Sequence, residues 1–345
     1  MGTTHEMTMK SPIQFSAKSY QGTKSIQARM AETRHAVERD VAFQMSYQRP
    51  DGGYIWEGYA PDAFHKQAYS WSLVGHFNEG HRLLDWALAN KLGKDGRLEG
   101  FNGDIYKHSW FCQSAIRLGR FEIAYPVMKF LKSCQQPCGG LPHFEATKKT
   151  VLRSLSTAWS GVTALYLGEI AMAKKCAEWC MNLQAQNTKK GRYYYMTDGE
   201  GKLLTEKNGG EYIDIKKEKQ CYWEVGFSML LMCKLYELTR EKKYLDSAKK
   251  YFEFKLTCAA DAYRFWGSGK SALAAAHYYM LTDDVRARDA SLTFCDFVVE
   301  TQQPNGGFLY EDEPDELLIY VDHAACFSVW ALESLATMAS KLVNA

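Results

Sequence analysis

Apolar residues recur three and four positions apart along most of this chain, and strand-like alternation of apolar and polar residues is nearly absent. Such spacing predicts α-helices that each carry an apolar face. One kind of helical run mixes charged and apolar residues, as in ARDASLTFCDFVVETQ. We expect these runs at 28–47, 78–90, 121–134, 169–186, 242–257 and 285–301.

A second kind of run alternates with the first and is richer in apolar and small residues, as in STAWSGVTALYLG. We expect these runs at 62–76, 105–118, 154–168, 220–238, 268–281 and 321–340. Helices of this composition are buried on most sides. Six mixed helices outside and six apolar helices inside, in strict alternation, predict an all-α fold in the form of a closed double ring, an (α/α)6 toroid.

The turns between paired helices repeat a short pattern, QRPDGGY at 48–54, QQPCGGL at 135–141 and QQPNGGF at 302–308. Their intervals are close to two and four units of about 42 to 44 residues, which is typical of repeated helix pairs. Weaker copies stand at 91–97, 183–195 and 258–266. The sequence therefore predicts six helix-pair units over 28–340, behind an N-terminal arm of 1–27, in one domain that spans 1–345.

Charge and cysteine usage narrow the class of protein. The net charge is +2, from 42 basic and 40 acidic residues, and no basic run suggests a nucleic-acid partner. No apolar stretch of about 18 residues predicts a membrane span, and the first residues lack the apolar core of a signal peptide. The ten cysteines are scattered, which predicts reduced thiols and a cytoplasmic location. Nothing in the sequence indicates an oligomeric state.

The turns of the form Gln-x-x-x-Gly-Gly-aromatic resemble those of the terpenoid cyclase and protein prenyltransferase toroids, over about 28–340. Other α/α toroids share the architecture with weaker turn similarity, among them carbohydrate lyases, epimerases and unsaturated-glycan hydrolases. The catalytic Asp-x-Asp-Asp and Asp-Asp-x-x-Asp motifs of the first group do not occur, and Cys326 follows Asp322 by four residues where the zinc site of the prenyltransferases needs two. We therefore expect neither a metal nor another cofactor.

Ionisable residues gather where the inner helices are expected to begin, and alternation with the outer helices places all six beginnings at one end of the ring. Three Asp/His pairs occur there, Asp62 with His65, Asp104 with His108 and Asp322 with His323. A carboxylate beside an imidazole orients it and raises its basicity, as general acid–base catalysis requires. Each Asp alternatively caps its helix. We predict that these six residues and Glu224 are the catalytic candidates.

Aromatic residues, 14% of the chain, are concentrated in the same places. Their rings stack on flat ligands or sugar rings and stabilise positive charge. We predict that a small-molecule substrate contacts Trp56, Tyr59, Tyr69, Trp110, Trp159, Tyr222, Trp223, Trp266 and Lys270.

An insertion at 192–219 has alternating residues and turn signals at Asp198-Gly199 and Asn208-Gly209, and it predicts a β-hairpin that covers the site as a lid. With the resemblance above, these features predict a metal-independent isomerase, cyclase or lyase of secondary metabolism. It would cyclise, isomerise or dehydrate a small hydrophobic terpenoid or polyketide-like metabolite in a central aromatic cavity. The alternatives are a carbohydrate-active enzyme of the unsaturated-glycan hydrolase, epimerase or lyase kind, and a non-catalytic binding scaffold.

Overall fold

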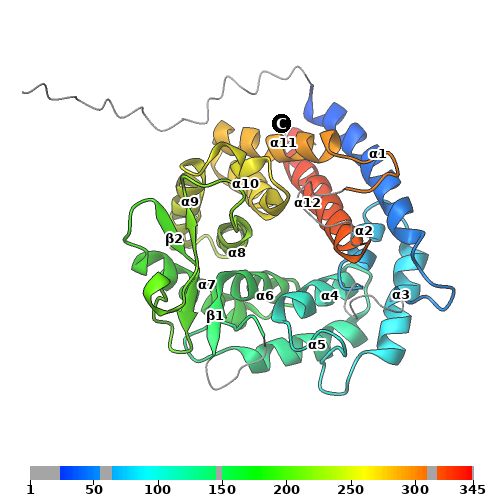
Figure 1. Ribbon diagram of the computed structural model, residues 1–345, viewed down its shortest axis with the longest axis horizontal. Coiled ribbons are helices and arrows are strands. Elements are labelled where there is room, and N and C mark those ends of the chain that lie inside the picture. Colours follow the sequence, from blue (N-terminus) through cyan, green and yellow to red (C-terminus); the bar gives the residue numbers. More distant parts are fainter. Residues whose placement is uncertain (1–23, 55–63, 145–149, 309–316, 344–345) are drawn as a thin grey trace, which may run out of the picture.

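The computed structural model describes residues 24–54, 64–144, 150–308 and 317–343. Within these ranges the helices form two concentric rings, as the apolar pattern predicts (Figure 1). The outer ring holds α1 (Ile26–Met45), α3 (Phe77–Asn90), α5 (Phe121–Cys134), α7 (Ile170–Gln186), α9 (Lys242–Leu256) and α11 (Val285–Glu300). The inner ring holds α2 (Gln67–Ser72), α4 (Ile105–Arg117), α6 (Ser154–Tyr166), α8 (Trp223–Thr239), α10 (Gly269–Thr282) and α12 (Leu317–Val343). The predicted α/α toroid is confirmed.

Burial separates the two rings because an inner helix has neighbours on both sides and an outer helix behind it. In α6 every residue from Ser154 to Ala164 is buried. In α3 the buried residues are confined to one face, at Gly80, Leu83, Leu84 and Ala87. Helix α12 packs against α10 on one side and α1 and α2 on the other, which closes the ring between its last and first units.

The repeated glutamines hold each turn to the next outer helix. Gln135 Nε2 donates to the carbonyl oxygen of Gly139 at 3.0 Å, which closes its own turn, and to that of Met172 in α7 at 3.2 Å. The other two glutamines make the same pair of bonds, Gln48 to Gly52 and to Glu79 in α3, and Gln302 to Gly306 and to Ala36 in α1.

The first glycine of each turn is required by its backbone. Gly139 has φ +95°, where a side chain is strained, and a Cβ there would lie 2.3 Å from the carbonyl oxygen of Lys175 in α7. Gly52 and Gly306 occupy equivalent positions, with φ +89° and +96°. The repeated turn is therefore a device for docking one helix pair on the next, and it carries no information about chemistry.

Four short strands belong to the insertion and to the segment before α6: β1 (Val151–Arg153), β2 (Arg192–Tyr194), β3 (Met196–Asp198) and β4 (Tyr212–Asp214). The predicted single hairpin is corrected to two antiparallel pairs, β1 with β3 and β2 with β4. Of the predicted turns, one follows β3 at Asp198, and Gly209 is left-handed with φ +87°. The difference arises because β3 finds a partner outside the insertion.

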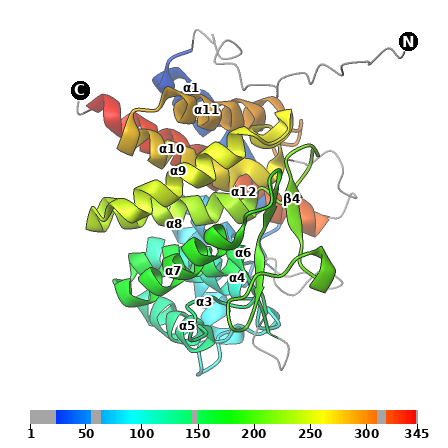
Figure 2. The same ribbon diagram turned by 90° about the vertical axis from the view of Figure 1, so that its left-hand side faces the viewer.

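The strands lie over the end of the ring at which the inner helices begin, which we call the N-terminal face. Ser154, the first residue of α6, donates its backbone N–H to the carbonyl oxygen of Tyr195, between β2 and β3, at 3.1 Å. Figure 2 shows the strands along one edge of the ring and the C-terminus at the opposite edge. Over the described ranges, every helix is too short or too polar to cross a membrane.

Candidate active site

The N-terminal face brings the segment before α2 against the beginning of α12. Lys66 Nζ lies 2.6 Å from Asp322 Oδ2, and His65 Nε2 lies 3.4 Å from Asp322 Oδ1. His65 and Lys66 are almost fully buried, whereas the Asp322 side chain is 23% exposed. His65 thus approaches the carboxylate of a distant helix. Its predicted partner Asp62, like Trp56 and Tyr59, lies outside the described residues.

The charges of this cluster fix its ionisation. Burial opposes the charge of Asp322, yet Lys66, His65 and His323 together hold the pKa of that carboxyl below its ordinary value. Burial likewise opposes the charge of Lys66, but Asp322 raises the pKa of the amine above its usual range. The pair is therefore an ammonium and a carboxylate, and it stays charged through the neutral range.

Buried aromatic rings line the interior behind this ion pair. Trp110, Trp159, Phe227 and Trp330 come from four inner helices, and their ring centroids lie 4.6 to 5.6 Å apart between neighbours. The Lys66 amine lies 5.7 Å from the Trp110 ring. Trp110 and Trp159 are thus placed at the centre of the ring, as packed side chains of its core.

A row of half-buried rings leads from these residues toward solvent. The Trp223 and Trp266 centroids lie 5.2 Å apart at 32°, and Trp266 and His323 lie 4.5 Å apart at the same angle. All three side chains are partly exposed, unlike the interior rings. Since His323 also lies next to Asp322 in the chain, the row connects the indoles to the charged cluster.

Lys270 enters the same region from the first turn of α10. Its amine lies 6.0 Å from the ring centroids of Phe227 and Trp266 and 5.7 Å from that of Trp330. It also lies 3.5 Å from the Cys326 sulfur, which accepts a hydrogen bond from Trp330 Nε1 at 2.9 Å.

The Asp104 and His108 pair is arranged differently from the prediction. Asp104 caps α4 by accepting from the backbone N–H of Lys107 at 3.1 Å. His108 Nδ1 lies 2.6 Å from the backbone carbonyl oxygen of Asp104, and His108 Nε2 accepts from the N–H of Leu98 at 3.1 Å. Burial lowers the pKa of this imidazole to about 4. The ring is held neutral between backbone groups, away from the carboxylate.

Glu224 is fully buried and joins two inner helices. Its carboxylate accepts from Arg153 Nε at 2.6 Å, from Ser154 Oγ at 2.8 Å and from the backbone N–H of Leu155 at 2.7 Å. The last two bonds satisfy groups at the beginning of α6, which is what a helix cap does. This position gives Glu224 a structural task and leaves it no contact with solvent.

The two remaining tyrosines point elsewhere. Tyr69 directs its hydroxyl toward Glu333, eleven residues further along α12 than Asp322, at 3.4 Å. Tyr222 donates to Asp261 at 2.7 Å and is completely buried. Among the described residues, neither tyrosine hydroxyl forms a hydrogen bond with Asp322, His65 or Lys66.

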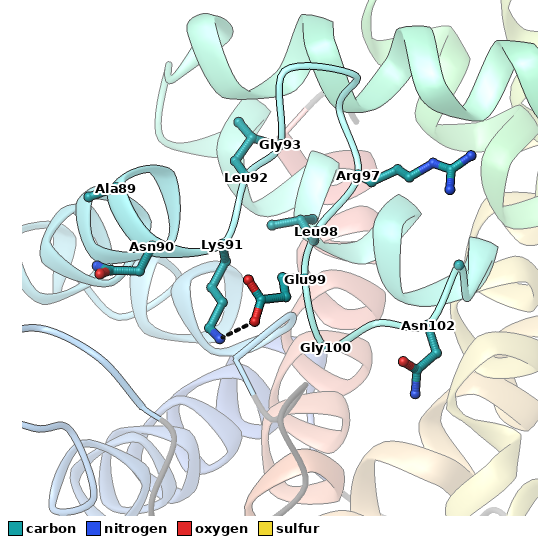
Figure 3. Close-up of a pocket in the computed structure, with 11 residues that line it drawn as sticks. Ala89, Asn90, Lys91, Leu92, Gly93, Arg97, Leu98, Glu99, Gly100 and Asn102 are labelled. Atoms are coloured by element: carbon teal, nitrogen blue, oxygen red, sulfur yellow. Dashed lines mark ion pairs between the residues drawn. The ribbon is translucent and has the colours of Figure 1, made fainter.

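A surface groove of about 560 Å³ lies in the connection between α3 and α4 (Figure 3). Lys91 and Glu99, which line it, form an ion pair of 3.7 Å, and Arg97 and Asn102 line it as well. None of the predicted site residues lines it. It is separate from the candidate active site.

Lys66, Cys326 and Trp330 belong to the cluster but were not among the predicted site residues, although Lys66 lies beside His65 in the first inner run and Cys326 was compared with a zinc ligand. Helical spacing shows which residues share a face, and it does not show which face of one helix meets which face of another. The one available signal was Lys66 itself, a lysine beside His65 at the start of an apolar inner run, where an unpaired charge would be costly.

No protein-family model matches the sequence, and no curated protein matches it significantly. Solved structures do match. A D-mannose isomerase aligns with 90% of this chain and 99% of its own, at 14% identity and a TM-score of 0.65. An α-1,6-mannanase of Salegentibacter sp. HEL1_6 aligns with 87% and 99%, at 17% identity and 0.61. An unsaturated glucuronyl hydrolase specific for heparin aligns with 92% and 99%, at 11% identity and 0.59.

These likenesses identify the fold as the α/α toroid found in carbohydrate-active enzymes. The expected resemblance to terpenoid cyclases and prenyltransferases is wrong, and so is the assignment to secondary metabolism, because the matching chains include mannanases, a sugar isomerase and an unsaturated glucuronyl hydrolase. The error has a physical source. The Gln and Gly-Gly turn docks helix pairs, a task that any such toroid must perform.

Proposed function

We propose that this chain is a carbohydrate-active enzyme that moves a proton on a reducing sugar, as an isomerase or epimerase. One observation carries the proposal: a charged Lys66–Asp322 pair, with His65 and His323 beside it, adjoins half-buried indoles on the N-terminal face. Sugar rings stack on indoles, and imidazoles transfer protons near neutral pH. The D-mannose isomerase among the structural neighbours supports the same class of reaction.

In the proposed reaction the open-chain sugar lies along Trp223 and Trp266, with its carbonyl toward the ion pair. His323, the partly exposed imidazole, removes the proton from the carbon next to the carbonyl. Lys66, held in its charged form by Asp322, stabilises the negative charge that develops on the carbonyl oxygen. His65, 3.4 Å from Asp322, returns a proton to the same carbon on its other face, which gives the epimer. Alternatively it protonates the former carbonyl carbon while the adjacent hydroxyl loses its proton and the former carbonyl oxygen gains one, which gives the isomer.

Glycan hydrolysis is less well supported by this geometry. Glycosidases use two carboxyl groups that flank the bond to be cut, and the neighbouring mannanase is inactivated by replacing two adjacent aspartates. The one Asp-Asp pair in this sequence is Asp283–Asp284, at the far end of α10 from Lys270, where Asp283 pairs with Lys341 and Asp284 caps α11. Among the described residues at the inner-helix beginnings, Asp322 is the partly exposed carboxylate.

The test is proton exchange on a panel of aldoses and ketoses that includes D-mannose, incubated in D2O and followed by NMR. We expect deuterium at the carbon next to the carbonyl, together with the isomeric sugar. Replacing His323→Ala or Asp322→Asn should slow exchange by about two to four orders of magnitude. Asp284→Asn, which makes the same charge change in a cap on an outer helix, is the matched control and should exchange normally. Release of reducing ends from a glycan, without exchange on any free sugar, would overturn the proposal.

A further inference from the structure

Lys270 is buried without the partner that a buried lysine normally has. Its side chain is 3% exposed, and among the described residues no carboxylate lies within ion-pair distance of its amine. The polar atom it contacts is the sulfur of Cys326, at 3.5 Å. Lys66, equally buried, has Asp322 at 2.6 Å. Of the two buried lysines of the site, Lys66 therefore has a carboxylate to balance its charge, and Lys270 has none within ion-pair distance among the described residues.

An ammonium group in such a position is costly, and the cost is relieved when the proton leaves. Burial is the main cause that lowers the pKa of Lys270, and the positive charge of Lys66 acts in the same direction. A neutral lysine amine next to another cation, in an apolar enclosure, is the state in which lysine attacks carbonyl carbon. Burial and Lys66 thus favour the neutral form of the Lys270 amine, while Asp322 favours the charged form of Lys66.

The enclosure also places the amine relative to the proposed base. Trp266 is near both groups: its ring centroid is 6.0 Å from the Lys270 amine and 4.5 Å from the centroid of His323. A sugar beside this indole can therefore lie near both the Lys270 amine and the His323 ring. Trp266 is half-buried, whereas the Lys270 side chain is 3% exposed.

From this juxtaposition we infer that Lys270 forms an imine with the carbonyl carbon of the open-chain sugar, an inference that rests on the proposed function. The amine adds to the carbonyl carbon, and the resulting carbinolamine loses its oxygen as water, which leaves a protonated imine. The iminium takes the place of the carbonyl that Lys66 would otherwise stabilise and withdraws electrons from the adjacent carbon, so His323 can take its proton and form an enamine. Reprotonation of the same carbon on its other face restores the iminium, and addition of water then releases the epimeric sugar and restores the amine.

The test is trapping by hydride. The full-length protein is incubated with D-mannose, or with whichever sugar shows exchange, and treated with sodium cyanoborohydride. Reduction of the imine to a secondary amine should increase the intact mass by that of the sugar less one oxygen atom, with the adduct mapped by peptide sequencing to Lys270. Lys270→Met should lose the adduct and the exchange, while melting as the wild type does or later.

Lys255 provides an internal control. It is 1% exposed, and burial lowers the pKa of its amine to about 7, but it lies at the end of outer helix α9 against the Tyr222 ring. If a neutral amine were enough for reaction, Lys255 would form the adduct as readily as Lys270. Equal adducts on the two lysines would therefore contradict the inference. The trapped fraction should be at least about tenfold higher at Lys270.

The outcomes separate this inference from the proposed function. Sugar exchange in D2O with no trapped adduct overturns the role of Lys270 and leaves the isomerase proposal standing. An adduct on Lys270 without exchange supports the imine and overturns the isomerase. Neither exchange nor an adduct with any sugar of the panel overturns both.

Discussion

Lys66 Nζ lies 2.6 Å from Asp322 Oδ2 and joins the segment before the first inner helix to the last inner helix of the ring. The two residues are 256 positions apart in the chain. The pair therefore has two tasks. It closes the inner ring at its seam, and it holds a positive charge 5.7 Å from the buried Trp110 ring, next to the region proposed for the substrate.

Replacing Lys66→Met should destabilise the protein by about 3 kcal/mol, because it leaves a largely buried carboxylate without its main partner. Chemical denaturation measures the loss. Lys242→Met breaks an exposed ion pair, in which Lys242 Nζ lies 2.7 Å from Asp246 Oδ1. This substitution should lower the free energy of unfolding by no more than about 0.5 kcal/mol. If both substitutions cost the same, the seam pair contributes no more than a surface pair does.

Asp40 should make stability depend on pH. It is completely buried in α1, and burial raises the pKa of its carboxyl to about 7 despite hydrogen bonds from Ser328 and Gln44. Between about pH 4 and pH 7 the folded protein thus holds a proton that the unfolded chain has lost, so stability falls as the pH rises through this window and is level above it.

Asp40→Asn removes that titration while keeping the shape of the side chain. Relative to the wild type it should gain stability as the pH rises from 4 to 8, by an amount on the order of 4 kcal/mol for a shift of this size. Asp246→Asn, at an exposed position, should show no such trend. A difference between wild type and Asp40→Asn that is independent of pH would mean that Asp40 is already charged at pH 4.

The two histidines that follow aspartates on inner helices should behave in opposite ways. His323→Ala removes a partly exposed ring from the site, so activity should fall while the melting temperature changes little. His108→Ala removes a buried ring that satisfies the Leu98 N–H, so stability should fall by about 2 to 4 kcal/mol while the remaining folded protein keeps its turnover. Thermal melting and exchange kinetics on the same samples measure both effects. Equal loss of activity in the two variants would contradict the assignment made from the geometry.

The architecture could be predicted from the sequence because it depends on local patterns. Helical periodicity located the outer and inner runs, and the alternation of their compositions gave the order of the rings. The glutamine and glycine turns gave the repeat, since each of them makes the same local bonds. In the insertion, local signals marked the turns, but the pairing of β3 with β1 depends on a strand over forty residues away, which no turn signal specifies.

The site was harder to predict because its contacts join different units. Local spacing predicted a pair between Asp104 and His108. In the structure the Asp104 carboxylate caps its own helix and the His108 imidazole contacts backbone groups. His65 was predicted to pair with Asp62 in its own unit, whereas its contact with Asp322 depends on how the segment before α2 packs against α12. The charge of Lys270 depends on burial and on the missing counterion, which only the packed structure reveals.

The docking role of the repeated turn gives the last prediction. Gln135 and Gln136 are adjacent and both partly buried, but only Gln135 reaches the next outer helix, while Gln136 donates to the nearby carbonyl of Cys134. Gln135→Ala should therefore cost about 1 to 3 kcal/mol, since it leaves the carbonyls of the turn and of α7 without a donor. Gln136→Ala should cost less than about 1 kcal/mol.

The glycine of the same turn sharpens the test. Gly139→Ala would force a side chain into a left-handed backbone and to 2.3 Å from the Lys175 carbonyl, so it should destabilise more than Gln135→Ala does. Gly168→Ala is the matched control, because that residue also has a positive φ, +74°, but has open space around it. Gly168→Ala should lower the free energy of unfolding only by the cost of placing a side chain on a left-handed backbone, on the order of 1 kcal/mol. If Gly139→Ala costs no more than Gly168→Ala, the turn can move away from α7, and its repeat does not reflect docking between units.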